Sequence, residues 1–193
     1  MFGSARSKLK AWIAGGIGTF AALAVGGALG MFDAVQKPVI VLEPGQPVET
    51  GPWEVRPLRA YTVDKGVYGL PLKAGEKALV FEAEMKNRTA LSSKDYFTTF
   101  KATGGTDDKP YIVLVRDSSM SPALQPGLPE RMAYVWGLPA GATPPDRFVL
   151  AVNGEIYKKQ DNLYGAPGWY NEHLIGTVAM PVGAGPDTPD ARP

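Results

Sequence analysis

Glycine and proline recur along this chain at short intervals, which limits the length of any regular element between them. The sequence contains 23 glycines and 18 prolines, well above their usual shares of about 7% and 5%. Such residues crowd both ends of the stretch Leu124–Ala142, while Met132, Tyr134 and Trp136 alternate with other residues in its middle. A period of two is typical of a strand that buries one face. The stretch therefore predicts one strand of a β-rich domain.

Other short runs have the same character. In the clearest one, 77–86, apolar residues alternate with Glu82 and Glu84, which we expect on an exposed face. Pro57 predicts a bulge or an edge, and Asn153-Gly154 predicts a hairpin turn. We predict strands within 36–43 and at 53–63, 77–86, 96–101, 111–115, 132–138, 148–152 and 174–182. About eight short strands separated by turns favour an all-β fold, an antiparallel β-sandwich.

The N-terminal region has a different composition. No charged residue occurs between Ala11 and Phe32, and a helix of that length spans roughly 33 Å, enough to cross a bilayer. Basic residues precede the run and Asp33 follows it, so the positive-inside rule places the N-terminus in the cytoplasm and the rest outside. We therefore expect a single transmembrane helix in the cytoplasmic (inner) membrane. A signal peptide cleaved after Ala24 is the alternative.

This helix would carry a stripe of small residues. They are spaced four apart, at Ala14, Gly18, Ala22, Gly26 and Gly30. Small residues at this spacing let two membrane helices approach closely. The stripe therefore predicts a packing face for a membrane protein partner or for a second copy of the chain. Its alternative is chance, because glycine and alanine are abundant throughout the run.

The chain divides into five expected regions. A basic cytoplasmic segment, 1–10, precedes the transmembrane helix at 11–32, and a connector follows at 33–47. The extracytoplasmic β-domain is expected at 48–182. The segment 183–193 is rich in proline, glycine and aspartate, which predicts a disordered tail.

Several kinds of chemistry find little support in the composition. The chain has no cysteine and one histidine, and its net charge is +1, which gives no nucleic-acid footprint. Asp107-Asp108 is a weak candidate for calcium, which needs six or more oxygen ligands. The serines at 118–121 lack a nearby base to activate them. We therefore expect no enzyme activity, no metal site and no cofactor.

Some of the strand and turn spacing resembles a known family. The residues concerned are Lys86–Thr89, Pro126-Gly127, Gly137–Pro139 and Phe148–Val152. Their pattern is similar to the bacterial family of uncharacterised telokin-like, immunoglobulin-like domains found on lipoproteins and membrane-anchored envelope proteins. The resemblance implies an immunoglobulin-like sandwich outside the cytoplasm and brings no catalytic residues with it. This chain differs in lacking the lipobox cysteine.

The best candidate for a binding site is the segment Tyr157–His173. We expect it to form a long loop between the last two strands, with four aromatic residues: Tyr157, Tyr164, Trp169 and Tyr170. Binding residues are often found on loops of a rigid scaffold, and tyrosine and tryptophan are favoured interface anchors. The alternative is a loop whose aromatic residues cover one end of the sandwich.

These features together predict a membrane-anchored protein-binding module of the cell envelope. We expect it to act as an accessory subunit of a membrane complex, through the lipid-embedded helix and the aromatic segment. The alternative is a domain that binds a small ligand, a glycan or a lipid, with Tyr164, Trp169 and Tyr170 stacking on it.

Overall fold

The computed structural model describes residues 39–104 and 109–185. These residues belong to the second of two compact units, Val39–Pro193. The helix expected at 11–32, with its stripe of small residues, lies outside the described residues, as do Asp107-Asp108 and the tail from 186. Within the described ranges, no helix is long and apolar enough to cross a membrane.

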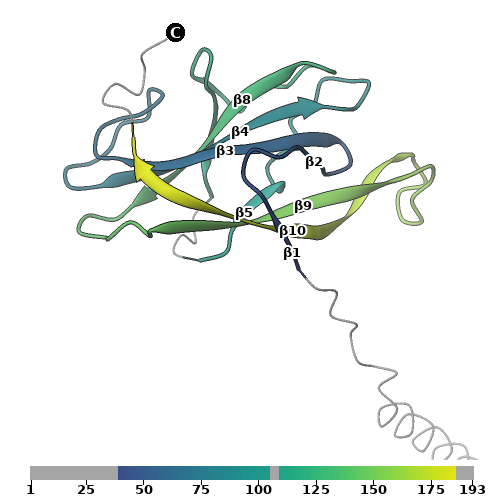
Figure 1. Ribbon diagram of the computed structural model, residues 1–193. Helices are drawn as coiled ribbons and strands as arrows, with labels where there is room; N and C mark the ends of the chain where they lie inside the picture. Colours follow the sequence, from purple (N-terminus) through teal and green to yellow (C-terminus); the bar gives the residue numbers. More distant parts are fainter. Residues whose placement is uncertain (1–38, 105–108, 186–193) are drawn as a thin grey trace, which may run out of the picture. The chain divides into compact units, whose positions relative to one another are not determined.

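The described residues form an all-β sandwich of two layers, which Figure 1 shows one above the other. One layer contains β2, β3, β4, β6, β7 and β8, and the other contains β1, β5, β9 and β10. The strands are β1 (Ile40–Leu42), β2 (Val48–Glu49), β3 (Trp53–Val63), β4 (Lys77–Asn87), β5 (Phe100–Ala102), β6 (Tyr111–Leu114), β7 (Ser119–Met120), β8 (Pro129–Leu138), β9 (Arg147–Lys158) and β10 (Gly168–Ala184). The prediction of a β-sandwich is confirmed.

Strand β10 joins the two layers. Its first part runs antiparallel to β9, and Val182–Ala184 then run parallel to β3, as the rising arrow in Figure 1 shows. β1 also lies parallel to β10, along Gly176–Val178. The expectation of a purely antiparallel sandwich is therefore wrong at these two pairings. No short turn connects β10 to either parallel neighbour, so no turn signal in the sequence could set their direction.

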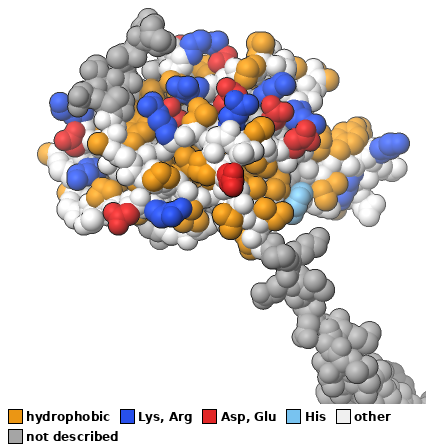
Figure 2. Space-filling model, in the orientation of Figure 1, with side chains coloured by type: hydrophobic (Ala, Val, Ile, Leu, Met, Phe, Trp, Pro, Cys, Tyr) orange, Lys and Arg blue, Asp and Glu red, His pale blue; other side chains and the backbone are white. Residues whose placement is uncertain are grey.

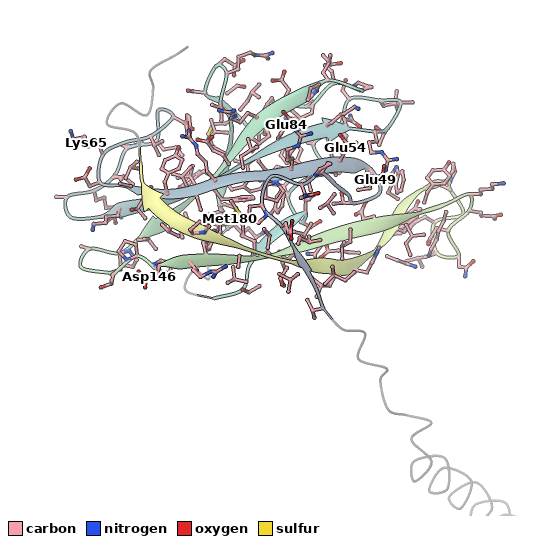
Figure 3. All side chains as sticks on the ribbon, in the orientation of Figure 1. Glu49, Glu54, Lys65, Glu84, Asp146 and Met180 are labelled. Carbon is pink, nitrogen blue, oxygen red and sulfur yellow. The ribbon has the colours of Figure 1, made fainter. Side chains whose placement is uncertain are left out.

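The main core lies between the layers. As the alternation predicted, Met132, Tyr134 and Trp136 of β8 are buried. Aromatic rings meet edge to face across the core, with centroids 4.9 Å apart for Phe81 and Phe100, a favourable geometry for aromatic pairs. Met180 of β10, labelled in Figure 3, belongs to the same core.

A second apolar cluster covers the outer face of the β3–β4–β8 layer. It contains residues of those strands and of β6, together with Val67 and Tyr68 from the connection between β3 and β4. Val67 and Leu70 exchange two backbone hydrogen bonds around Tyr68-Gly69. Both central residues have positive φ, 50° and 75°, as a type I′ turn requires. The connection thus folds back over a sheet face that would otherwise be exposed.

Glu82 is buried beneath this connection, with no exposed surface. The expectation that it lies on an exposed strand face is therefore wrong, while Glu84 stays partly exposed. Arg59 donates two hydrogen bonds to the Glu82 carboxylate, of 3.0 and 2.8 Å, and the hydroxyls of Tyr61 and Tyr68 each donate one of 2.8 Å. The alternation of residues along β4 does not predict the burial of Glu82, because the loop that covers it comes from elsewhere in the chain.

Several strand ends differ from expectation. β9 runs through Asn153-Gly154, where a hairpin turn was predicted, and the predicted strand at 96–101 is mainly turn until β5 begins at Phe100. A Cβ on Gly154 would lie 2.5 Å from Ile175 Cδ1 and 2.7 Å from the Thr50 carbonyl oxygen. Close packing inside the strand therefore requires glycine at this position. The Asn-Gly dipeptide alone does not show whether its glycine serves close packing or a turn. Pro57 does sit at a register shift, as predicted.

The edges of the domain also shift. Strand β1 lies within the region expected to be a connector, and β10 continues to Ala184, beyond the expected end of the domain. Both extensions pair with residues far away in the sequence. Local composition carries no information about such pairings.

Candidate functional site

The aromatic segment Tyr157–His173 is largely a strand hairpin. β9 extends to Lys158 and β10 begins at Gly168, so the loop is confined to 159–167. Tyr157, Trp169 and Tyr170 therefore lie on strands, and Tyr164 lies in the loop. The expectation of one long loop is wrong because the pairing of Tyr157 with Trp169 continues the β9–β10 ladder past a bulge. Figure 1 shows this hairpin extending beyond the rest of the sandwich.

The four aromatic residues form two pairs. The rings of Tyr157 and Trp169 meet edge to face with centroids 5.4 Å apart, and those of Tyr164 and Tyr170 stack at 6.0 Å. The Lys158 ammonium lies 5.7 Å from the centre of the Tyr170 ring, within the range of a cation–π contact. The Tyr157–Trp169 pair joins the two strands of the hairpin, and the Tyr164–Tyr170 pair joins its loop to β10.

Asp161 organises the hairpin loop. Its Oδ1 accepts hydrogen bonds from the backbone N–H groups of Leu163 and Tyr164, at 2.8 and 3.2 Å. Its Oδ2 accepts one from Lys158 Nζ at 2.9 Å. The Lys158 bond and these backbone donors hold the pKa of Asp161 below its usual range. The loop is therefore built around a charged side chain that caps its own backbone.

A groove of about 900 Å³ lies beside the hairpin. Tyr157, Gly168 and Trp169 line it from the hairpin, and the connection between β4 and β5 supplies most of the other lining residues. Three large apolar side chains of this groove are well exposed: Leu91 at 77%, Phe97 at 51% and Tyr157 at 53%. The full lining is Pro52, Thr89, Ala90, Leu91, Ser92, Ser93, Asp95, Phe97, Thr98, Glu155, Tyr157, Gly168 and Trp169.

Trp169 lines the groove from the first residues of β10. Its ring packs on the backbone of Gly51, where an added Cβ would lie 2.9 Å from Trp169 Cζ3. Gly51 also has a positive φ of 98°, so glycine is favoured there for two reasons. The partly buried Trp169 thus has a fixed position, whereas Leu91 stays exposed.

Asn87 holds the connection between β4 and β5 in place, and it is fully buried at the end of β4. Its Nδ2 donates hydrogen bonds to the carbonyl oxygens of Leu91 and Leu124, at 2.8 and 2.9 Å. Its Oδ1 accepts from both the backbone and the hydroxyl of Thr89. Asn87-Arg88-Thr89 also matches a glycosylation sequon in the sequence. That match does not indicate that the Asn87 side chain is buried and bonded to the loop. Asn87 fixes the loop that presents Leu91.

Two carboxylates, Asp95 and Glu155, line the groove, and Glu172 lies near Glu155. Burial raises the pKa of Glu155, and the neighbouring carboxylates of Asp95 and Glu172 raise it further. Glu172 is paired with Lys101 and also accepts a hydrogen bond from Asn153. Glu155 therefore sits in a negative environment that disfavours its own charge. In the ranges 39–104 and 109–185, no group of acidic and histidine side chains has the arrangement of a metal site.

Two of the four aromatic residues predicted to bind a partner, Tyr157 and Trp169, line this groove, whereas Tyr164 and Tyr170 do not. The residues of the connection between β4 and β5 were not predicted. Leu91 and Phe97 lie in a polar stretch between two strands, and single apolar residues of that kind are common on protein surfaces. What makes them part of a site is that they line the same groove as Tyr157. Figure 2 shows hydrophobic side chains exposed at the end of the molecule that carries the hairpin.

The other candidates from the sequence lie apart from this groove. Ser118–Ser121 form a turn and the short strand β7, where the Asp117 carboxylate accepts hydrogen bonds from Ser119. His173 lies on β10, with Nδ1 3.1 Å from the Asn171 carbonyl oxygen. Neither residue set lines the groove.

Comparison with known proteins assigns no family to this chain. No family model matches the chain, and no curated protein matches it. A solved structure that is similar is an uncharacterised β-sandwich protein from Clostridium difficile 630. It shares 10% sequence identity, with coverage of 77% of this chain and 99% of that one and a TM-score of 0.47.

Proposed function

We propose that this chain is a non-enzymatic module that binds another protein at the cell envelope, and that the groove beside the hairpin is its recognition site. The sequence supports an anchor at 11–32 in the inner membrane, with the β-domain outside it. The telokin-like, immunoglobulin-like resemblance agrees with such a location. The module would then act as an accessory subunit of a membrane complex.

The observation that carries this proposal is the exposure of large apolar side chains around one groove. Leu91, Phe97 and Tyr157 present apolar surface to water in a groove that Trp169 also lines. Exposed apolar side chains grouped at a concave site are typical of a surface that a partner covers. A fixed tryptophan surrounded by such contacts resembles the anchor of a protein interface.

The proposal is tested by crosslinking in the native membrane. A photoreactive amino acid replaces Leu91 or Phe97 of the full-length chain in its own host, and Tyr111 of β6 serves as the control. Tyr111 is exposed to a similar degree, at 58%, and is not part of the groove lining. We expect the same protein adduct from both groove positions and none from the control.

Two results would contradict the proposal. Adducts of equal yield from all three positions would show that contact with the groove is not specific. A crosslinked group of low mass that protease does not digest would instead support the binding of a glycan or a lipid. That result would also identify the alternative class of ligand directly.

A further inference from the structure

In the part of the chain that the structure describes, the edge of β9 that faces away from β10 has no strand beside it at Tyr157. On this side of β9, the Val149 carbonyl accepts a hydrogen bond from Thr103, and the N–H groups of Asn153 and Glu155 donate to Thr99 and Thr50. Backbone groups of alternate residues in a strand point to the same side. The N–H and C=O of Tyr157 therefore point to this side too. Among the described residues, the pairing on this side ends at Glu155.

The groove begins where that pairing stops. Glu155 and Tyr157 both line it, and so does Thr98, which directly precedes Thr99, the partner of Asn153 on this edge. The groove therefore lies on the same side of β9 as β5, beyond the bond between Glu155 and Thr50. An open strand edge of this kind is a template for a further strand.

We propose that the partner enters the groove as an extended segment and adds a strand to β9 at Tyr157. This inference deepens the proposed function and rests on it, because it specifies how the groove recognises a protein. In strand addition, backbone hydrogen bonds hold the segment and alternate side chains select it. The open edge is short, so side-chain contacts within the groove must supply most of the specificity.

The lining indicates which side chains the segment carries. Leu91, Phe97 and Tyr157 offer apolar contacts, so one set of alternate residues in the segment is apolar. Asp95 and Glu155 offer carboxylates in the same groove. Glu172 already has Lys101 as its cation, whereas Glu155 is surrounded by negative neighbours. A lysine or arginine in the segment would relieve that repulsion, which makes the occupant a basic, apolar, extended segment of another protein.

The test uses the full-length chain in detergent and a displayed library of random dodecapeptides. We expect the selected peptides to combine basic residues with apolar residues in alternation. Synthetic versions then carry a methyl group on one backbone nitrogen at a time, which removes one N–H donor. Methylation of the one nitrogen that donates to the Tyr157 carbonyl should weaken binding roughly tenfold, and methylation of the two neighbouring nitrogens should not.

A matched pair of variants tests the charge. Glu155→Gln should lower the affinity of the basic peptides, whereas Glu76→Gln should not. Glu76 lies in the connection between β3 and β4 and is not part of the groove lining. Both variants keep the shape of the side chain, so folding is compared directly by thermal unfolding.

The outcomes distinguish strand addition from the proposed recognition of a protein by the groove. Peptides that bind the groove but tolerate methylation at every position would overturn strand addition and leave groove recognition in place. Selection of apolar residues with a helical spacing would do the same. If no peptide is selected, strand addition is overturned, and the crosslinks at Leu91 and Phe97 decide separately whether a protein occupies the groove.

Discussion

The Tyr68 hydroxyl donates a 2.8 Å hydrogen bond to the Glu82 carboxylate across the outer face of the sheet. Tyr68 does so from a backbone φ of 50°, a conformation that a bulky residue seldom adopts. The connection between β3 and β4 is therefore fixed in place by a buried charge that also binds Arg59 and Tyr61. This cluster concerns stability, and it is separate from the groove residues.

The stability of the domain should fall in acid through Glu82. Burial alone would raise the pKa of Glu82, but hydrogen bonds from Arg59, Tyr68 and Tyr61 outweigh it and leave the pKa lowered. A lowered folded-state pKa means that the stabilisation is complete above the unfolded value of about 4.3. It is lost as the pH falls below that value and through the folded pKa. Urea unfolding of the wild type and Glu82→Gln should differ at pH 7 and converge in acid.

The size of the difference at pH 7 follows from the surroundings of the pair. Glu82 is fully buried, whereas the Arg59 side chain is 51% exposed and can be solvated when its partner is lost. We expect Glu82→Gln to destabilise the domain by about 2 kcal/mol, below the cost of breaking a fully buried pair. A difference that stays constant from pH 7 to pH 3 would contradict this account.

Tyr68→Phe tests the hydrogen bond itself. The variant removes the hydroxyl that bonds Glu82 and keeps the aromatic ring in the second apolar cluster. We expect a loss of about 1 kcal/mol, because a hydrogen bond to a charged group is lost while its acceptor keeps other donors. A double-mutant cycle with Glu82→Gln should show coupling between the two residues. Additive effects would mean that Tyr68 acts through packing alone.

Gly154→Ala tests the placement of this glycine inside β9. The added methyl would lie 2.5 Å from Ile175 Cδ1 and 2.7 Å from the Thr50 carbonyl oxygen, so we expect a loss of roughly 1–3 kcal/mol. Gly137→Ala is the matched control, because a Cβ there meets no atom within 4 Å. Equal unfolding free energies for the two variants would contradict the close packing at Gly154.

The small-residue stripe gives a prediction about association in the membrane. Replacing Gly18, Ala22 and Gly26 by leucine should abolish any association through the helix, because bulky residues separate the two backbones. The β-domain should unfold at the same temperature as before. Sedimentation of the full-length chain in mild detergent measures the size of the complex. An unchanged size would remove the stripe as a packing face.

The alternation of Met132, Tyr134 and Trp136 was sufficient to predict a buried strand face, because its period depends on local geometry alone. Burial of Glu82 could not be predicted, since it depends on a loop that reaches the sheet from elsewhere. Similarly, the sequence identified Tyr157 as a binding candidate but did not indicate that Leu91 lines the same groove. Contacts between distant segments decide both features, and neither leaves a periodic pattern.

Two leucines of similar exposure allow the most direct test of the groove. Leu91 is 77% exposed in the groove wall, and Leu163 is 80% exposed in the hairpin loop outside it. Aspartate at either position should change the unfolding free energy by no more than about 0.5 kcal/mol. The measurement is the amount of the crosslinked partner recovered with each variant, with the photoreactive residue at Phe97. We predict that Leu91→Asp greatly reduces the recovery and that Leu163→Asp leaves it unchanged; equal recovery from both would contradict the assignment of the groove as the binding site.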